Sequence, residues 1–157
     1  MKTLKRRRKQ AKTDYKARFT MLKSEKPRLV VRKTNHYIIA QIVESQIAQD
    51  KVVAKASSQE LLEKGWPKEK SGSLKSLPAA YLTGFLLVKN IKTKVNEAIL
   101  DFGLNRNIHG SRIYALVKGA IDAGLKIPHK ESTLPKTERI EANEKLKSIF
   151  KEVKEKL

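Results

Sequence analysis

The stretch Pro27–Val43 constrains the fold most, because it has the pattern of two β-strands joined by a tight turn (PRLVVRKTNHYIIAQIV). The β-rich runs Arg28–Lys33 and Tyr37–Val43 flank Thr34-Asn35-His36, a short polar turn centred on Asn. This pattern predicts a β-hairpin. Pro27 suits the first position of a strand, where no backbone N–H is needed for the ladder.

Both faces of the predicted hairpin carry apolar residues. In the second strand Ile38 and Ile42 face one way and Ile39 faces the other. Apolar residues on both faces predict strands in the middle of a sheet that is covered on both sides. The hairpin also carries cations toward its turn, at Arg32 and Lys33. They are either solvated turn residues or contacts to an anion, and the pattern alone leaves both interpretations open.

The net charge narrows the class of partner. The 157 residues include 35 Lys and Arg against 16 Asp and Glu, a formal charge of +19 with a pI near 10.2. Such a charge indicates a polyanion, with nucleic acid favoured over an anionic membrane. No apolar run approaches the roughly 20 residues of a spanning helix, and residues 1–20 lack the apolar centre of a secretory signal. The absence of cysteine excludes disulfides and thiolate zinc sites.

Much of the positive charge lies at the N-terminus. Residues 1–33 hold 14 basic and 2 acidic side chains, and so contribute +12 of the total. Like charges as dense as those in the run Lys5–Lys9 repel one another and resist burial. Residues 1–12 are therefore predicted to form a tail that is disordered when free. A helix is predicted after it, with Asp14 near its start and with Tyr15, Phe19 and Leu22 docked on the body of the protein.

The hairpin is followed by a third strand and a short helix. Residues 51–57 are predicted to form an edge strand because of their lysines, which makes the first three strands an antiparallel meander. Residues 58–64 read as a short helix capped by Ser57 or Ser58. The single tryptophan, Trp66, could stack on a base, but a local packing role is favoured. Residues 68–75 read as a linker without core-forming side chains.

The second half of the chain alternates helix, strand and helix. Residues 77–90 are predicted to form a deeply buried helix, in which Gly84 permits close approach to the sheet. Residues 97–102 are predicted to form a fourth strand that runs parallel to its neighbour. The loop Gly103–Gly110 lies at the carboxyl end of that strand, where open α/β sheets place ligands. Ser111 is predicted to cap the next helix, whose amino end favours a phosphate.

These elements predict an α/β fold in which a mixed sheet combines the three-strand meander with one parallel strand and packed helices. Three regions are expected: a basic N-terminal extension over residues 1–26, an α/β RNA-binding domain over 27–130 and a C-terminal helical extension over 131–157. The last helix is expected to begin at Thr137 or Glu138. Because residues 131–157 contain 7 basic and 6 acidic side chains, this helix is expected to pack or to contact protein rather than RNA.

No catalytic constellation is found. Asp101 ends a central strand, but a two-metal nuclease needs several converging carboxylates, whereas the first strand offers cations. Asp101 is therefore interpreted as a structural cap of the loop. His36, His109 and His129 lack metal-site spacing, and no nucleophile elbow or phosphate loop is present. No metal, cofactor, small-molecule substrate or membrane partner is expected.

Three stretches together resemble a known family: KPRLVVRKTNHYIIAQIV (26–43), PAAYLTGFLL (78–87) and AILDFGLNRNIHGSRIYALVKGAIDAGLKIPH (98–129). They are similar to the family of large-subunit ribosomal protein eighteen, in its archaeal and eukaryotic branch. The resemblance implies a cytoplasmic structural constituent of the large ribosomal subunit that attaches 5S rRNA to the large-subunit rRNA in the central protuberance. It also implies three partners: 5S rRNA, 23S-type rRNA and large-subunit ribosomal protein five.

The resemblance implies a set of RNA-facing residues spread over the tail, the hairpin and the loop. By analogy with the family they are Lys5, Arg6, Arg7, Arg8, Lys9, Lys12, Tyr15, Lys16, Arg18, Arg28, Arg32, Lys33, Asn35, His36, Arg106, His109 and Arg112. The alternative from another class is a nucleic-acid-processing enzyme, a nuclease, on a related sheet. The missing acidic cluster argues against it. A sequence-specific DNA binder is disfavoured because no recognition-helix motif is present.

Overall fold

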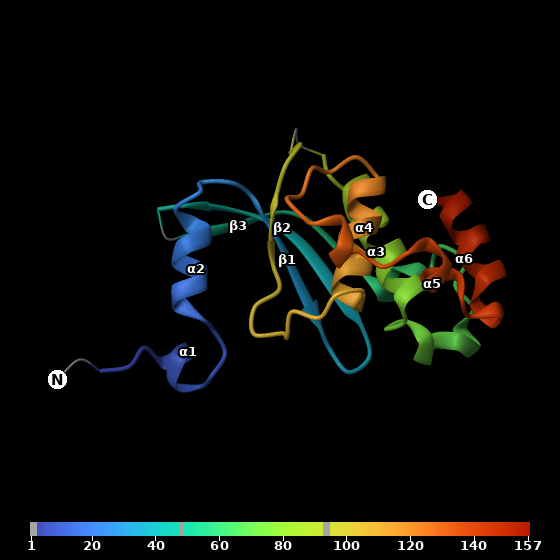
Figure 1. Ribbon diagram of the computed structural model, residues 1–157, viewed down its shortest axis with the longest axis horizontal. Coiled ribbons are helices and arrows are strands. Elements are labelled where there is room, and N and C mark those ends of the chain that lie inside the picture. The colour runs from blue at the N-terminus through green and yellow to red at the C-terminus, as the bar shows by residue number, and fades with distance from the viewer. Residues whose placement is uncertain (1–2, 48, 93–94) are drawn as a thin grey trace.

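The computed structural model describes residues 3–47, 49–92 and 95–157 and shows an α/β fold (Figure 1). The strands of its mixed sheet are β1 (Arg28–Lys33), β2 (Ile38–Gln46), β3 (Gln49–Ser57) and β4 (Ile99–Asp101). They lie in the order β3-β2-β1-β4, with β4 parallel to β1 and the other pairs antiparallel. The predicted meander, the central hairpin and the parallel fourth strand are confirmed. The fourth strand is shorter than predicted.

Six α-helices and three short 3₁₀ helices complete the described part of the chain. The α-helices are α1 (Arg6–Lys9), α2 (Tyr15–Leu22), α3 (Leu77–Lys89), α4 (Arg112–Asp122), α5 (Thr137–Glu141) and α6 (Glu144–Lys156). The 3₁₀ helices are η1 (Ser58–Leu62), η2 (Lys68–Ser73) and η3 (Glu131–Thr133). None of the described helices is long and apolar enough to cross a membrane.

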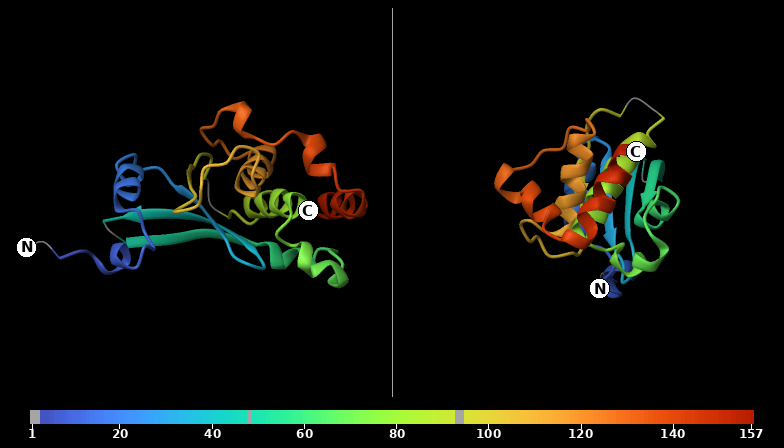
Figure 2. Two further views of the ribbon diagram at one scale, coloured as in Figure 1. Left: turned by 60° about the horizontal axis from the view of Figure 1, so that its bottom comes forward. Right: turned by 90° about the vertical axis from the view of Figure 1, so that its right-hand side faces the viewer.

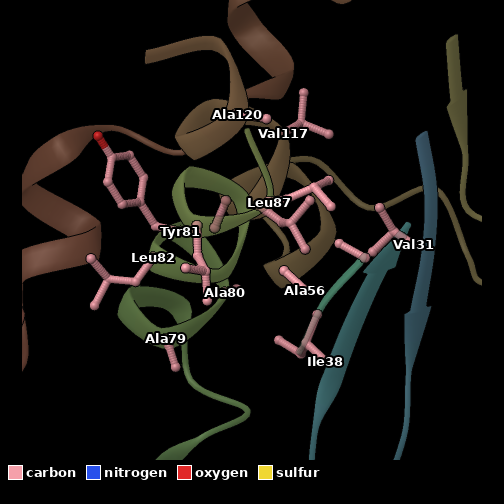
Figure 3. Packing of buried hydrophobic residues seen from close by; sticks show 14 of the residues in the cluster. Val31, Ile38, Ala56, Ala79, Ala80, Tyr81, Leu82, Leu87, Val117 and Ala120 are labelled. Carbon is pink, nitrogen blue, oxygen red and sulfur yellow. The ribbon is translucent and has the colours of Figure 1, made fainter. Parts of the chain in front are cut away.

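The helices α3 and α4 both pack on one face of the sheet (Figure 2). That face buries Leu29 and Val31 of β1 and Ile38 of β2, and Figure 3 shows the last two close to Leu87 of α3. On the other face Val30 and Ile39 are only half-buried. The prediction that both faces of the hairpin are covered is therefore wrong for these positions. Apolar residues on both faces of a strand do not show that the fold supplies a second element to cover each face.

The helices α3 and α4 cross at two glycines. A Cβ added to Gly84 would collide with the backbone carbonyl of Leu116, and one added to Gly119 would collide with that of Tyr81. The predicted close approach at Gly84 is real, but its partner is α4 and not the sheet. The two glycines let the helix backbones approach more closely than any larger side chain would allow.

Gly84→Ala is expected to lower the free energy of unfolding by about 1–3 kcal/mol, because the added methyl group overpacks the helix crossing. A urea titration followed by circular dichroism measures this change. The matched control is Gly72→Ala, since a Cβ added to Gly72 would meet no atom within 4 Å. Its expected effect is within about 0.5 kcal/mol. Equal effects of the two substitutions would contradict the role given to the crossing.

The C-terminal segment forms two helices where one was predicted. They separate at Asn143, whose backbone (φ −89°, ψ 100°) is extended rather than helical. The expectation that the last helix packs is confirmed for α6, which buries Leu146, Ile149, Phe150 and Val153 on one apolar stripe. The ring of Phe150 meets that of Tyr81 edge-on at 5.4 Å between centroids. The C-terminal helix is thus part of the core.

Two predictions about the segment that connects β3 to α3 have opposite outcomes. Trp66 is 1% exposed, and its Nε1 donates to the Lys70 carbonyl and to Ser73 Oγ (3.2 Å each), which confirms the packing role. Leu74 is fully buried, so the expectation that residues 68–75 lack core-forming side chains is wrong. The 3₁₀ helix η1 begins after Ser57, which forms a capping box with Glu60 as a predicted cap should.

Candidate nucleic-acid interface

The N-terminal extension lies beside the end of the sheet that is farther from α3 and α4 (Figure 1). The helix α2 begins after Asp14, whose Oδ1 accepts hydrogen bonds from the backbone N–H groups of Lys16 (2.9 Å) and Ala17 (3.1 Å), so its predicted start is confirmed. However, α2 has no buried residue and Phe19 is 61% exposed. The expectation that its apolar residues dock on the body is wrong for Phe19.

Most cations of this extension are free to meet a polyanion. Within the described part of the chain, six of the predicted RNA-facing residues are exposed and form no ion pair: Arg6, Arg7, Arg8, Lys9, Lys12 and Lys16. Lys5 is also unpaired, and its Nζ lies 4.9 Å from the ring centroid of Tyr15. Whether residues 1–12 are disordered when free stays a prediction, and residues 1–2 lie outside the described residues.

Arg28 does not face solvent and is a correction to the predicted set. Its side chain is 2% exposed. Its Nη1 donates to Asp101 Oδ2 (3.0 Å), and its Nη2 donates to Asp50 Oδ1 (3.0 Å) and to Ser45 Oγ (3.1 Å). An RNA phosphate cannot reach this guanidinium without displacing a carboxylate. Arg28 is therefore the centre of a buried ionic network that joins β1 and β4 to the adjoining ends of β2 and β3.

Asp101 is the second buried member of this network. Its Oδ1 accepts hydrogen bonds from the Gly103 backbone N–H (2.9 Å) and from Arg32 Nη2 (3.0 Å). The predicted structural cap of the loop is thus confirmed. Both carboxylate oxygens are engaged by arginines, which disfavours the nuclease alternative. Among the residues with described positions, no group of three or more acidic or histidine side chains could hold a metal ion.

Asp50 ties the N-terminal extension to the sheet. Its Oδ2 accepts from Arg18 Nη2 at 2.7 Å, while its Oδ1 accepts from Arg28 and from the Ser45 hydroxyl (2.6 Å). Burial alone would raise the pKa of Asp50, but the hydrogen bonds from Ser45 and Arg18 and the two arginine charges lower that pKa below its ordinary 3.8. The sequence prediction missed Asp50, because only the folded sheet brings this residue of β3 close to both arginines.

The second group of predicted residues gathers where β1 and β4 end. These strands are parallel neighbours, so their carboxyl ends lie at the same edge of the sheet. Lys33, Arg106 and Arg112 line one hollow there, at the amino end of α4. Asn35, His36 and His109 are exposed, and each lies within three positions of one of these cations in the sequence. Arg32 is partly exposed, at 45% of its side chain, and its Nη1 and Nη2 also hold Asp101.

Ser111 occupies the cap position of α4, as predicted, but its side chain makes no capping hydrogen bond. Its Oγ is buried and has no hydrogen-bond partner within the described residues. The amino end of α4 therefore keeps a buried hydroxyl without a partner beside the first-turn N–H groups, which have no partner within the helix. Both features favour an anion at this end of the helix.

Fold and charge together define a basic α/β protein whose free cations lie on two surfaces. These are the N-terminal extension and the edge of the sheet at the carboxyl ends of the parallel strands. The family described as ribosomal large subunit proteins 60S L5 and 50S L18 matches residues 1–98 and 92–130. The chain belongs to this family, which confirms the resemblance seen in the sequence. Its role is that of a structural ribosomal protein and not of an enzyme.

The chain is similar to several proteins named large ribosomal subunit protein uL18. It is 49% identical over 136 residues to that of Korarchaeum cryptofilum (86% of this chain, 68% of the relative). It is 46% identical over 137 residues to that of Aeropyrum pernix (86% and 62%). With that of Methanoregula boonei it shares 42% identity over 157 residues (96% and 88%). The chain thus spans less than two thirds of the Aeropyrum relative's length.

Proposed function

We propose that this protein binds 5S rRNA and helps to attach it to the 23S-type rRNA in the central protuberance of the large ribosomal subunit. It does so in the cytoplasm, beside large-subunit ribosomal protein five. Family membership supports a place in the large subunit. The observation that carries the RNA contact is the set of free cations at the carboxyl end of β1 and β4, beside the amino end of α4.

The two cationic surfaces are proposed to divide the work. The N-terminal extension has little buried surface, so its cations neutralise phosphates without fixed geometry and supply affinity. The turn after β1 and the loop before α4 are fixed by the sheet, by Asp101 and by the amino end of a helix. Rigid donors of this kind recognise RNA by shape, by 2′-hydroxyl groups and by exposed bases.

Purification of the native protein from cell extract at moderate salt tests the function directly. The expected result is a co-purifying RNA of 5S size together with a second ribosomal protein. Recovery of mixed RNA without enrichment of the 5S species would contradict the proposal. Shortening of added RNA in the presence of magnesium, abolished by Asp101→Asn, would instead favour the nuclease alternative.

Asn35→Ala is expected to narrow the affinity gap between 5S rRNA and an unrelated structured RNA about two- to tenfold, because one fixed hydrogen-bonding side chain is lost. Arg32→Ala should act in the same direction. Filter binding of both RNAs at one salt concentration measures the gap. The control is Lys16→Ala in the N-terminal extension, which should weaken both RNAs alike. The division of work is refuted if all three substitutions weaken both RNAs equally.

A further inference from the structure

The hollow at the amino end of α4 has a cationic wall that comes from the C-terminal extension. Its charged lining residues come from four segments, namely β1, the loop after β4, α4 and α5, and all of them are cations. They are Lys33, Arg106, Arg112 and Arg139. No carboxylate lines the hollow in the described part of the chain. Arg139 was not predicted as a contact residue, because the charge of residues 131–157 nearly balances.

The chain holds the C-terminal extension against this hollow through several contacts. The Gly110 backbone N–H donates to the Thr133 carbonyl (2.9 Å). Lys118 Nζ donates to the Pro135 carbonyl, also at 2.9 Å. Ile140, the residue after Arg139, is 2% exposed and belongs to the hydrophobic core. The position of Arg139 is therefore fixed by the contacts of the residues that precede it and by the burial of the residue that follows it.

Gly110 makes room for the guanidinium of Arg139. A Cβ added to Gly110 would lie 2.7 Å from Arg139 Nη1, and the backbone of Gly110 has a φ of +65°. A larger residue would therefore be strained at this position and would also push the guanidinium away. The loop before α4 and the C-terminal extension thus fit together at the mouth of the hollow.

The charge of Arg139 is not neutralised within the described part of the chain, where it forms no ion pair. The same is true of Lys33, Arg106 and Arg112. Four like charges around one hollow repel one another, and an anion bound between them removes that repulsion. The unpartnered Ser111 Oγ and the first-turn N–H groups of α4 supply further donors.

The rim of the hollow is partly apolar. Leu104 and Ile108 are each 56% exposed, and both line it together with the cations. Cations that contact phosphate beside exposed apolar side chains that contact a sugar or base suit a nucleic-acid strand. Because the cations and the helix-end donors accept a carboxylate as well as a phosphate, the exposed apolar rim and the proposed function are what favour RNA over an acidic protein as the occupant.

From this geometry we infer that Arg139 is an RNA-contact residue and that the C-terminal extension is part of the RNA-binding surface. Arg139 completes a phosphate site with the loop and α4, and its ligand is the backbone of 5S rRNA. The inference rests on the proposed function. It gives the C-terminal extension two roles, since α6 packs in the core while α5 presents a cation to RNA.

Directed hydroxyl-radical cleavage tests this placement, because the chain has no cysteine that would compete for the probe. An iron chelate is attached to Arg139→Cys, and the protein is bound to 5S rRNA at saturating concentration. Cleavage of the RNA at a defined site is expected. The matched control is Lys151→Cys on the exposed side of α6, which should give no cleavage. A complex that forms but is not cut from position 139 overturns the inference.

Affinity measurements provide an independent test. Arg139→Ala is expected to weaken 5S rRNA binding roughly tenfold and to make the log–log salt slope shallower by about 0.7–0.9. Arg139→Lys should recover part of the affinity, and Lys151→Ala should change neither quantity. Thermal unfolding of each variant checks that the fold is retained.

The outcomes separate this inference from the proposed function. If the wild-type protein does not select 5S rRNA, the proposed function and the inference both fail. If the wild type selects 5S rRNA and Arg139→Ala binds equally well, only the inference fails. If Arg139→Ala keeps its RNA affinity but loses a co-purifying protein, the hollow is a protein contact and the inference is again overturned.

Discussion

Asp101→Ala is expected to lower the free energy of unfolding by about 3–5 kcal/mol, because it removes the buried carboxylate partner of the Arg28 guanidinium and leaves only the partly exposed Asp50 to pair with it. The side chains of Arg28 and Asp101 are 2% and 6% exposed, so water cannot replace the lost contact. The substitution also removes the carboxylate that caps Gly103 and holds Arg32. Urea denaturation, followed by circular dichroism, measures the loss.

Two comparisons test the physical reason for this prediction. The double variant Arg28→Met with Asp101→Leu should recover much of the lost stability, since replacing a buried ion pair by apolar side chains is often neutral. Glu97→Ala breaks the exposed pair with Lys26 (2.9 Å) and should cost less than about 1 kcal/mol. A cost below 1 kcal/mol for Asp101→Ala would mean that the buried network does not stabilise the fold.

The sheet could be predicted because its information is local. The alternating residues of β1 and β2, the polar turn between them and the lysines of β3 each lie within a few positions of one another. The parallel direction of β4 follows from the helix that precedes it. Ser57 and Asp14 act as helix caps for the same reason, because a cap is decided by the residues that follow it.

The role of Arg28 could not be predicted, because its partners are distant in the sequence. Asp50 is 22 positions away and Asp101 is 73 positions away, and only the sheet brings them together. A strand that carries Arg28 and Arg32 therefore looks like a cationic surface. In the fold, one of these residues is buried and the other is shared between Asp101 and solvent. Gly84 is a similar case, since a glycine within a buried helix indicates a close approach but does not show which element approaches it.

In the candidate site, too, the features that depend on local sequence could be predicted and those that depend on distant residues could not. The loop Gly103–Gly110 and the amino end of α4 follow directly from the strand–loop–helix order. Arg139 does not, because net charge averages over a segment whereas binding depends on where each charge lies. The nearly neutral composition of residues 131–157 conceals one cation that lies against the loop. Burial of the α6 stripe, by contrast, follows from its periodicity.

Deletion of residues 1–12 is expected to weaken RNA binding by a hundredfold or more at low salt, because about five to seven phosphate contacts are lost. The log–log salt slope should become shallower by about 0.7–0.9 for each lost contact. The thermal transition should stay nearly unchanged, since residues 3–12 include no buried side chain and Leu4 is 63% exposed. Replacement of the run Lys5–Lys9 by glutamines keeps the chain length and should reproduce most of the loss. An unchanged salt slope after the deletion would show that the N-terminal extension does not bind RNA.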